Sequence, residues 1–541
     1  MRRSILFSMA VVLAVAGGTG LAAGQATAGQ GTAGHGGAGQ GVAADRRPGV
    51  LLVCNGSTAP CPAGGPYYRT VQGAVDAASP GDWILIYPGV YHEKSTRWPT
   101  AGVWIDKPDL HIRGLNRDLV IIDGSNGTAA HPCPSAAAEQ DLTPRSGIVV
   151  YKASGVTLQN LTVCDYLAGS SGGGNEIWWD GGDGSGTIGL GSFSGSYLTA
   201  TSEYAPAAVN SPALAQYGIF AGNASGPGLI THSYASNMAD GAFYVGACRR
   251  VCDTTLSGDT GVNSALGYTG TNSGGRLVIT NSVFTLNHAG VVPNSRNNDD
   301  APPPQDGRCP GSATRSCTII SDNLIENNNN PNTPNDGVGA TAPVGVGIQV
   351  AGGSYDTVTG NVIADQGAWG VVTSDNPDPE QPPPPSHCQG GIENDPAPGV
   401  CLFEAVGNQV YGNVFSHDGI FGNQTNSDLA DATLGSYTPR NCFYRNADLS
   451  GRLTSAPADI EAASADGRPC AGAGSGPDVA LEDQLICNTG AEPCPLPPGA
   501  AKYPRQTRTV LLPLPRLASM PDPCAGVPGN AFCPVGRPVP R

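Results

Sequence analysis

The chain has 541 residues, of which 77 are Gly and 47 are Pro, about twice the usual share of these two residues. Charged residues make up 13% of the chain and the formal net charge is −16. The scarcity of Lys and other helix formers excludes a helical bundle or a long coiled coil. The acidic balance argues against a nucleic-acid partner, because phosphate binding needs a basic surface. With 39% hydrophobic residues the chain still has enough apolar material for a core.

The N-terminus has the three-part pattern of a secretory signal peptide. Arg2 and Arg3 precede an apolar run from Ile5 to Ala16, and small residues follow. That run is too short to span a bilayer, and no later segment reaches transmembrane length. We therefore expect residues 1–28 to be a signal peptide and residues 29–47 a flexible Gly/Ala-rich linker. The mature protein is expected to be secreted and extracellular, without a membrane span.

The sixteen cysteines indicate a disulfide framework, since an even number in an exported chain favours disulfides. A zinc site is the weaker interpretation, because neighbouring cysteines have no histidine at ligand spacing. Six pairs are close enough in sequence to close local loops: Cys54/Cys61, Cys248/Cys252, Cys309/Cys317, Cys388/Cys401, Cys487/Cys494 and Cys524/Cys533.

From about residue 50 to 445 the sequence repeats a glycine followed by a short apolar strand. These glycines are Gly147, Gly218, Gly241, Gly290, Gly347, Gly370 and Gly419, and the spacing between neighbours is 23 residues in two cases. Second strands begin at Asn281, Asn323, Asn361 and Asn413. Such a repeat is too short for βαβ units. It predicts a coil that stacks parallel strands about 4.8 Å apart, with glycines at bends that allow φ > 0 and asparagines in ladders.

On these repeats the chain resembles the right-handed parallel β-helix proteins of the pectin lyase-like superfamily, which includes pectate lyases. The strongest stretch is Thr70–Ala78 followed by Pro80–Tyr91, which resembles the N-terminal capping helix and first coil of such proteins. The resemblance implies an all-β fold. Residues 48–445 would form a single-stranded right-handed parallel β-helix with long disulfide-closed loops, and residues 446–541 an irregular extension rich in Pro, Ala and Cys.

Two intervals between glycines are longer than one coil and predict insertions. They run from Gly290 to Gly347 and from Gly370 to Gly419. Both insertions begin just after a glycine-led strand. Because stacked coils place equivalent positions in one column, the residues that follow these strands are expected to line a common groove.

The groove is expected to carry the chemistry. Carboxylates serve as general acid, base or nucleophile on sugars, arginine pairs with uronate carboxylates, and tryptophan packs against sugar rings. The candidate catalytic residues are Asp180, Asp183, Asp299, Asp300, Arg249 and Arg296. The candidate substrate-binding residues are Trp178, Trp179, Glu176, Lys152 and Asp375. No metal site is assigned, although these carboxylates could alternatively bind a Ca²⁺ ion through their oxygens.

Each of these patterns has a structural interpretation as well. Tryptophans in a strand also fill cores, residues 297–300 also suit a polar turn, and arginines in a tight disulfide loop are often solvated. Glu93 belongs to the first coil and is expected to be structural. His417 and Asp418 are expected to form a bend rather than an acid–base pair.

The functional hypothesis is a secreted β-helix protein that acts on extracellular polysaccharide as a lyase or glycoside hydrolase. Its site would lie on the loops that flank one parallel sheet. The alternative is a non-catalytic carbohydrate-binding or cell-surface interaction protein on the same fold. We expect a monomer with a polysaccharide partner, no nucleic-acid partner and no certain cofactor.

Overall fold

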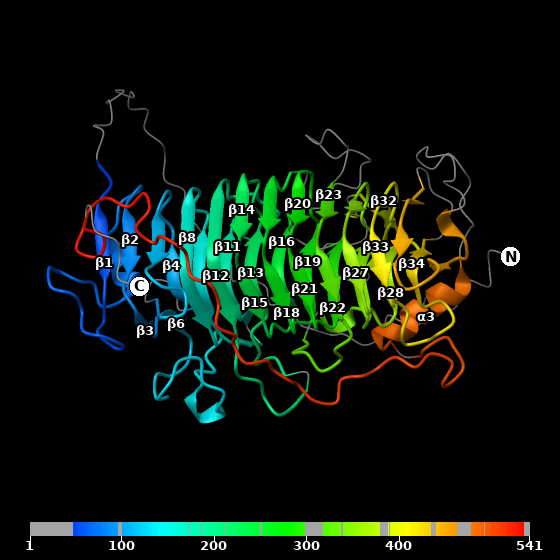
Figure 1. The fold of residues 1–541 in the computed structure, drawn as a ribbon, viewed down its shortest axis with the longest axis horizontal. Coiled ribbons are helices and arrows are strands. Elements are labelled where there is room, and N and C mark those ends of the chain that lie inside the picture. The colour runs from blue at the N-terminus through cyan, green and yellow to red at the C-terminus, as the bar shows by residue number, and fades with distance from the viewer. Residues whose placement is uncertain are drawn as a thin grey trace, which may run out of the picture.

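The computed structural model describes residues 47–95, 100–170, 172–183, 185–209, 211–248, 251–297, 317–336, 339–378, 388, 390–433, 440–461, 478–491 and 493–534. The chain winds into an elongated parallel β-helix (Figure 1), and each complete coil contributes to three faces. The expected right-handed parallel β-helix is therefore confirmed. No helix within the described ranges is long and apolar enough to cross a membrane.

Each of the three faces of the β-helix is a ladder of parallel strands. Face 1 contains β1 (Val50–Val53), β2 (Trp83–Ile86), β5 (His111–Gly114), the first half of β8 (Val156–Cys164) and of β12 (Phe193–Thr201), β14 (Gly228–Thr231), β17 (Thr254–Ser257), β20 (Leu277–Thr280), β23 (Thr318–Ser321), β26 (Thr357–Thr359), β32 (Gln409–Tyr411) and β35 (Cys442–Tyr444).

Face 2 follows face 1 in every complete coil. It contains β3 (Gly89–Tyr91), β6 (Val120–Asp123), the second halves of β8 and β12, β15 (Tyr234–Ser236), β18 (Thr260–Val262), β21 (Val283–Thr285), β24 (Leu324–Glu326), β27 (Val362–Ala364), β33 (Val414–Ser416) and β36 (Ala447–Asp448).

Face 3 completes each coil and is the face that carries the candidate site. It contains β4 (Ala101–Ile105), β7 (Ser146–Tyr151), β11 (Asn175–Asp180), β13 (Tyr217–Gly222), β16 (Gly241–Gly246), β19 (Leu266–Thr271), β22 (Ala289–Asn294), β25 (Val346–Ala351), β28 (Trp369–Ser374), β34 (Ser427–Ala432) and β37 (Ser455–Ala456). The ladders thus continue beyond residue 445.

The register of face 3 decides which side chains enter the core. Ile148, Ile177 and Ile219 pair across neighbouring strands and are fully buried in the main core. Trp179 lies two positions after Ile177, so it points to the same side, and it is also fully buried. Because side chains alternate along a strand, Trp178 projects to the outer surface.

The repeated glycines form an inward-facing column on face 3, for a different reason from the one expected. A Cβ on Gly290 would lie 2.3 Å from the carbonyl oxygen of Gly347, and one on Gly347 would lie 2.5 Å from that of Gly370. These three glycines are not among the residues with positive φ. Close approach of the next coil, rather than a left-handed bend, therefore requires glycine here.

Two of the expected repeat glycines lie outside this column. Ala242, not Gly241, is the column residue between Gly218 and Gly267, as the strand register shows. Gly419 has φ of 78° and lies in a turn, and the strand of its coil is β34, which begins at Ser427. Because Gly419 does not begin a strand of face 3, the spacing from Gly370 to Gly419 does not give the length of the insertion in this coil.

Asparagine ladders at the bend between faces 1 and 2 confirm the predicted role of these residues. The backbone N–H of Asn323 donates to the side-chain Oδ1 of Asn361, at 3.0 Å, and Asn361 donates in the same way to Asn413, at 3.1 Å. The Nδ2 of Asn361 also donates to the Ile320 carbonyl of the preceding coil. Ser282, rather than Asn281, holds the equivalent place one coil earlier.

The N-terminal cap is the helix α2 (Val71–Ala77), as the resemblance implies. The Thr70 hydroxyl accepts a hydrogen bond from the Gly73 N–H. Glu93 accepts from the N–H groups of Val71 and Gln72, at 2.6 and 3.1 Å, so its carboxylate satisfies the free donors of the first turn. The structural role expected for Glu93 is confirmed.

Disulfides close the loops as predicted in five of the six local pairs. The bonds Cys54–Cys61, Cys248–Cys252, Cys388–Cys401, Cys487–Cys494 and Cys524–Cys533 are present. Cys309 lies outside the described residues. One further disulfide, Cys133–Cys164, joins positions 31 residues apart and was not predicted.

Loops interrupt the coils both after and before strands of face 3. The first predicted insertion follows β22, and most of it lies outside the described residues. The second follows β28 and forms a small antiparallel sheet of β29 (Asn376–Asp378), β30 (Ile392–Glu393) and β31 (Cys401–Phe403). Another loop, between β24 and β25, contains the 3-10 turn η3 (Gly339–Thr341).

The C-terminal extension packs on the β-helix. Helix α3 (Val479–Thr489) lies against the last coils, and residues 503–534 then run back along the helix towards its first coils (Figure 1). Along this path Leu512 and Asn237 exchange two hydrogen bonds, and Arg113 donates to the carbonyl of Ala525. Near the end of the path, the ring of Phe532 stacks on Tyr67. We call residues 503–534 the C-terminal strap.

Candidate functional site

The outer surface of face 3 is divided into two halves of different chemistry. Over the later coils it is apolar and covered, because Leu481 of α3 and Tyr503 of the strap pack on Trp369 and its neighbours in a buried cluster. Over the earlier coils it carries half-buried aromatic rings and charged groups. The earlier half is therefore the part of this surface where a ligand can contact aromatic and polar side chains.

A strip of aromatic rings crosses the earlier half. Trp178 stacks on Phe220 with ring centroids 5.2 Å apart and an interplanar angle of 11°. Phe220 then packs edge-on against Tyr244, at 4.4 Å, and contacts Tyr217, at 4.8 Å. One coil before this group, Trp104 stacks on Tyr151. Trp178, Phe220, Tyr217, Trp104 and Tyr151 are all half-buried, and we call this set together with Tyr244 the aromatic strip.

A polar cluster lies beside the aromatic strip. The Tyr217 hydroxyl donates to the Asp240 carboxylate at 2.8 Å. Asp240 directly precedes β16 and is 5% exposed, and the N–H of Gly339 in the loop between β24 and β25 also donates to it. Arg296 follows β22 and is held by its backbone N–H, which donates to Asn272 at 2.8 Å. Tyr217 and Asp240 thus hydrogen-bond across neighbouring coils, and the charge of Arg296, from a later coil, acts electrostatically on both.

The electrostatics couple these three groups. Burial raises the pKa of Asp240 to about 6, while the Tyr217 hydroxyl and the Arg296 guanidinium act in the opposite direction. Burial and the neighbouring Asp240 charge raise the pKa of the Tyr217 phenol well above its ordinary value, and Arg296 opposes this shift. Tyr217 is therefore a neutral hydrogen-bond donor to a carboxylate that changes protonation close to neutral pH.

A second charged pair lies at the other end of the strip, where the sequence predicted it. Lys152 Nζ and Asp183 Oδ2 are 2.7 Å apart. This bond lowers the pKa of Asp183 to about 2 and raises the pKa of Lys152. Asp180 is half-buried and accepts from the Gly182 N–H. The structure thus brings Lys152, Asp180 and Asp183 together, beside the outward-facing Trp178.

Two predicted substrate-binding residues point the wrong way. Trp179 is 0% exposed and packs on Phe193 inside the β-helix, so it cannot contact a polysaccharide. Glu176 stands in the inward-facing glycine column, and it is also 0% exposed. For Trp179 the reason is the alternation of side chains along β11, which places Trp178 outside and Trp179 inside. For Glu176 the reason is its position at the start of the strand, in register with Gly147 and Gly218, where the column faces the core.

The predicted residues do not form one compact site. Asp183 follows β11 and Arg296 follows β22, four coils later, which corresponds to about 19 Å along the β-helix axis. Asp375 lies two coils further and accepts from the Ala405 N–H, which anchors the small antiparallel sheet. Arg249, Asp299 and Asp300 lie outside the described residues.

Sequence reasoning missed Tyr217 and Asp240. Both residues stand immediately before a glycine of the repeat, Gly218 and Gly241. The expected groove comprised the residues that follow each strand and not those that precede it. A polar residue directly before the repeat glycine was the available signal, but only the folded chain shows that Arg296 lies near both.

Comparisons with solved structures find other β-helix proteins at low identity. The A-module of the Azotobacter vinelandii mannuronan C-5 epimerase AlgE4 matches with 13% identity and a TM-score of 0.38, covering 70% of this chain and 90% of that one. A mutant tailspike protein of E. coli bacteriophage HK620, solved in complex with pentasaccharide, matches with 11% identity and a TM-score of 0.37, covering 69% of this chain and 62% of the tailspike. No protein-family model and no curated protein matches the chain.

Proposed function

We propose that the protein is secreted and cleaves an extracellular polysaccharide that contains uronate units, by β-elimination on the earlier half of the face 3 surface. The observation that carries the proposal is the cluster of Tyr217, Asp240 and Arg296 beside the aromatic strip. The two solved β-helix proteins named above are, by their own descriptions, a polysaccharide-modifying enzyme and a tailspike bound to an oligosaccharide.

The aromatic strip would hold the chain of sugar units. Indole and phenol rings pack on the apolar faces of sugars, and Trp178 and Trp104 lie half-buried on successive parts of the same outer surface. A guanidinium binds a carboxylate with two parallel hydrogen bonds, so Arg296 would bind the uronate carboxylate of the reacting unit.

The polar cluster would supply the proton transfers. With its carboxylate bound to Arg296, the uronate unit has an acidic C5–H, and the Tyr217 oxygen takes this proton while its own proton passes to the Asp240 carboxylate. Arg296 stabilises the negative charge that develops on the substrate carboxylate. The C4–O bond then breaks, a C4–C5 double bond forms, and the proton returns from Asp240 through Tyr217 to the leaving oxygen. No oxidant, reductant or water is consumed.

Elimination is preferred to hydrolysis because of the groups present. A glycoside hydrolase uses two carboxyl groups on either side of the scissile bond. Within the described part of the cluster, Asp240 is hydrogen-bonded to a phenol and lies within the electrostatic influence of Arg296, and a second nearby carboxylate, Asp336, accepts a hydrogen bond from the Gln216 amide. This combination suits neutralisation of a uronate and abstraction of the proton next to it.

The test is to incubate the secreted protein with uronate-containing and neutral polysaccharides and to follow both the absorbance of unsaturated uronates and the release of reducing ends. Elimination predicts both signals together, and only with uronate substrates. Tyr217→Phe and Arg296→Gln should each lower the rate by about a hundredfold or more. Tyr411→Phe, which removes a phenol from face 1, is the matched control and should leave the rate unchanged. Reducing ends without unsaturated product would instead support a hydrolase.

A non-catalytic carbohydrate-binding function is the second candidate. It is favoured by the contacts of Phe220, which stacks on Trp178 and packs edge-on against Tyr244, so that the three rings form a broad aromatic surface. Binding to a glycan without any product, with affinity lost in Trp178→Ala but retained in Tyr217→Phe, would establish this function and exclude the elimination mechanism.

A further inference from the structure

The loop between β24 and β25 joins the polar cluster of the site to the C-terminal extension. We call residues 327–345 the bridging loop, and the structure describes its two arms, residues 327–336 and 339–345. The loop contains no cysteine and one charged residue, Asp336. No disulfide can therefore hold this loop, and its conformation depends on hydrogen bonds to other parts of the chain.

On one side, the bridging loop is hydrogen-bonded to the segments that precede β13 and β16. The Asp336 Oδ2 atom accepts from the Gln216 side-chain amide at 3.2 Å. The Gly339 N–H donates to the Asp240 carboxylate. Because Gln216 directly precedes Tyr217 in the chain, the loop is joined to both of the segments that form the Tyr217–Asp240 hydrogen bond.

On the other side, the strap holds the first arm of the bridging loop. The Gln506 side-chain amide donates to the Thr333 carbonyl at 2.9 Å. The Thr507 N–H donates to the Asn332 side-chain Oδ1 at 3.1 Å, and the Val510 N–H donates to the Asn332 backbone carbonyl at 2.7 Å. Three successive contacts thus bind the strap to two adjacent residues of the loop.

Helix α3 holds the second arm. The side chain of Asn488 exchanges two hydrogen bonds with the backbone of Val344, at 3.0 and 2.9 Å. Asn488 is 1% exposed, so these bonds are shielded from water. The β-helix adds the ring of His288, whose Nε2 atom lies 3.0 Å from the Ala342 carbonyl oxygen. Both arms are therefore held by the C-terminal extension.

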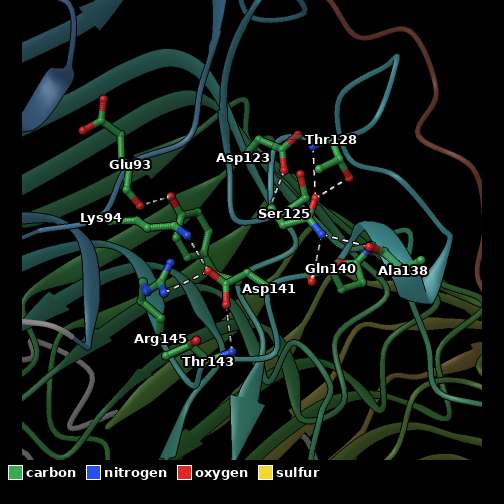
Figure 2. A network of polar contacts seen from close by, with 12 residues as sticks. Glu93, Lys94, Asp123, Ser125, Thr128, Ala138, Gln140, Asp141, Thr143 and Arg145 are labelled. Atoms are coloured by element: carbon green, nitrogen blue, oxygen red, sulfur yellow. Dashed lines mark hydrogen bonds and ion pairs between the residues drawn. The ribbon is translucent and has the colours of Figure 1, made fainter.

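A loop at the same place in an earlier coil is held in a different way. Residues 124–145 join β6 to β7, and Figure 2 shows the Asp141 carboxylate of this loop between Lys94 and Arg145. The two nitrogens lie 2.7 and 3.1 Å from Asp141 Oδ2, and the Cys133–Cys164 disulfide ties the loop to β8. Ion pairs and a disulfide fix this loop without any contribution from the extension, in contrast to the bridging loop.

We propose that the C-terminal extension positions the site through the bridging loop. Gln506 and Asn488 hold the two arms of the loop, and the loop in turn presents the Gly339 N–H to the Asp240 carboxylate. A backbone N–H that donates to a carboxylate favours its ionised form. Ionised Asp240 is the form that receives the Tyr217 proton, so Gln506 and Asn488 act as positioning residues. This role rests on the elimination proposed above.

Release of the loop should change the pH dependence of the reaction and not only its rate. Burial raises the pKa of Asp240 to about 6, and the Gly339 N–H opposes this rise. The titratable and charged groups that also act on Asp240 are Tyr217, Arg296 and Asp336. Without the Gly339 N–H the pKa of Asp240 should rise, and the midpoint of the pH–rate profile should move up by about one pH unit. The rate would then fall about fivefold near pH 6 and change little near pH 8.

The test compares the full-length secreted protein with variants of the extension. The principal variant combines Gln506→Ala with Asn488→Ala and so releases both arms, and Gln506→Ala alone is made in case the double variant fails to fold. The release of unsaturated uronates is measured as a function of pH. Hydrogen exchange of peptides from residues 327–345 is followed by mass spectrometry, which needs no substrate. We expect faster exchange in these peptides and the upward shift of the midpoint.

Asp141→Asn is the matched control, because it weakens the loop of the earlier coil, and it should alter neither the midpoint nor the exchange of residues 327–345. Unchanged exchange in the variants of the extension would overturn the inference, whether or not the parent cleaves polysaccharide. Faster exchange with an unmoved midpoint, or a rate lowered equally at every pH, would also overturn it, because the loop would then be merely structural.

A parent protein that yields no unsaturated product would refute the proposed elimination, and with it the positioning role. The exchange measurement would then show separately whether the extension holds the loop. Failure of the proposed function and failure of the coupling between extension and loop are therefore distinguishable.

Discussion

Replacement of Asp418 by Asn is expected to stabilise the protein, and more strongly as the pH rises. Asp418 stands in a second ladder of polar side chains, at the bend between faces 2 and 3, and its Oδ1 accepts from the Gln366 N–H at 2.8 Å. In the preceding coils, Asn328 and Gln366 each use their side-chain nitrogen to donate to a carbonyl of the coil before, those of Phe284 and Ile325. In place of that side-chain nitrogen, Asp418 has the oxygen Oδ2, which is buried without a hydrogen-bond partner.

A protonated Asp418 carboxyl group can donate a hydrogen bond as an amide does, and the pKa of Asp418 is raised accordingly. Burial, together with the nearby Asp428, Asp365 and Asp448, raises the pKa of Asp418 to about 9. The folded state therefore keeps a proton that the unfolded chain releases above its ordinary pKa of 3.8. The contribution to stability is fully present below about pH 4 and is lost progressively as the pH rises towards 9.

The size of the effect follows from the pKa difference. At 1.36 kcal/mol per unit, holding the proton from pH 3.8 to pH 7 removes about 4 kcal/mol from the free energy of unfolding. An amide does not titrate and supplies the missing donor, so Asp418→Asn should recover about 2–4 kcal/mol at neutral pH.

Urea unfolding at about pH 5, 7 and 9 measures the difference directly. The stability gap between the variant and the parent should widen with pH. Asp322→Asn, which removes an exposed carboxylate from a neighbouring bend, is the control and should change stability by less than about 0.5 kcal/mol at every pH. A constant gap for Asp418→Asn across this range would refute the assignment of a buried, protonated ladder acid.

Three further predictions concern the glycine column, the strap and the reaction. Gly290→Ala would place a Cβ 2.3 Å from the Gly347 carbonyl oxygen and should lower the free energy of unfolding by about 1–3 kcal/mol, measured by urea titration. Gly451→Ala is the control, because a Cβ there meets no atom, and it should leave the free energy of unfolding nearly unchanged. A chain ending at Tyr503 lacks the rest of the strap, including the residues that bind Asn237 and Arg113, so its Tm should fall; an unchanged Tm would show that residues 504–534 contribute nothing to stability. The elimination rate should rise with pH through about 6, because ionised Asp240 must accept the Tyr217 proton, and a flat pH profile would contradict that role.

The repeat could be predicted because the same contact between neighbouring coils recurs at the same position of each coil. A glycine is needed wherever the next carbonyl approaches closely, as at Gly290 and Gly347, and an asparagine wherever a bend offers both a donor and an acceptor, as at Asn361. Spacing alone could not separate these glycines from Gly419, which lies in a turn with positive φ. The two classes of glycine look alike in sequence and differ only in backbone conformation.

The sequence by itself determined the β-helix, its capping helix, five of the local disulfides and the presence of Arg296 and Lys152 after their strands. Tertiary structure decided which side of each strand faces out. Trp178 and Trp179 are adjacent and chemically identical, yet one lies on the surface and the other in the core, because a shift of one residue in register exchanges the two faces of a strand. Tertiary structure also brought Tyr217 into hydrogen-bond distance of Asp240 and both within the electrostatic influence of Arg296, since residues of different coils interact only after the coils have stacked.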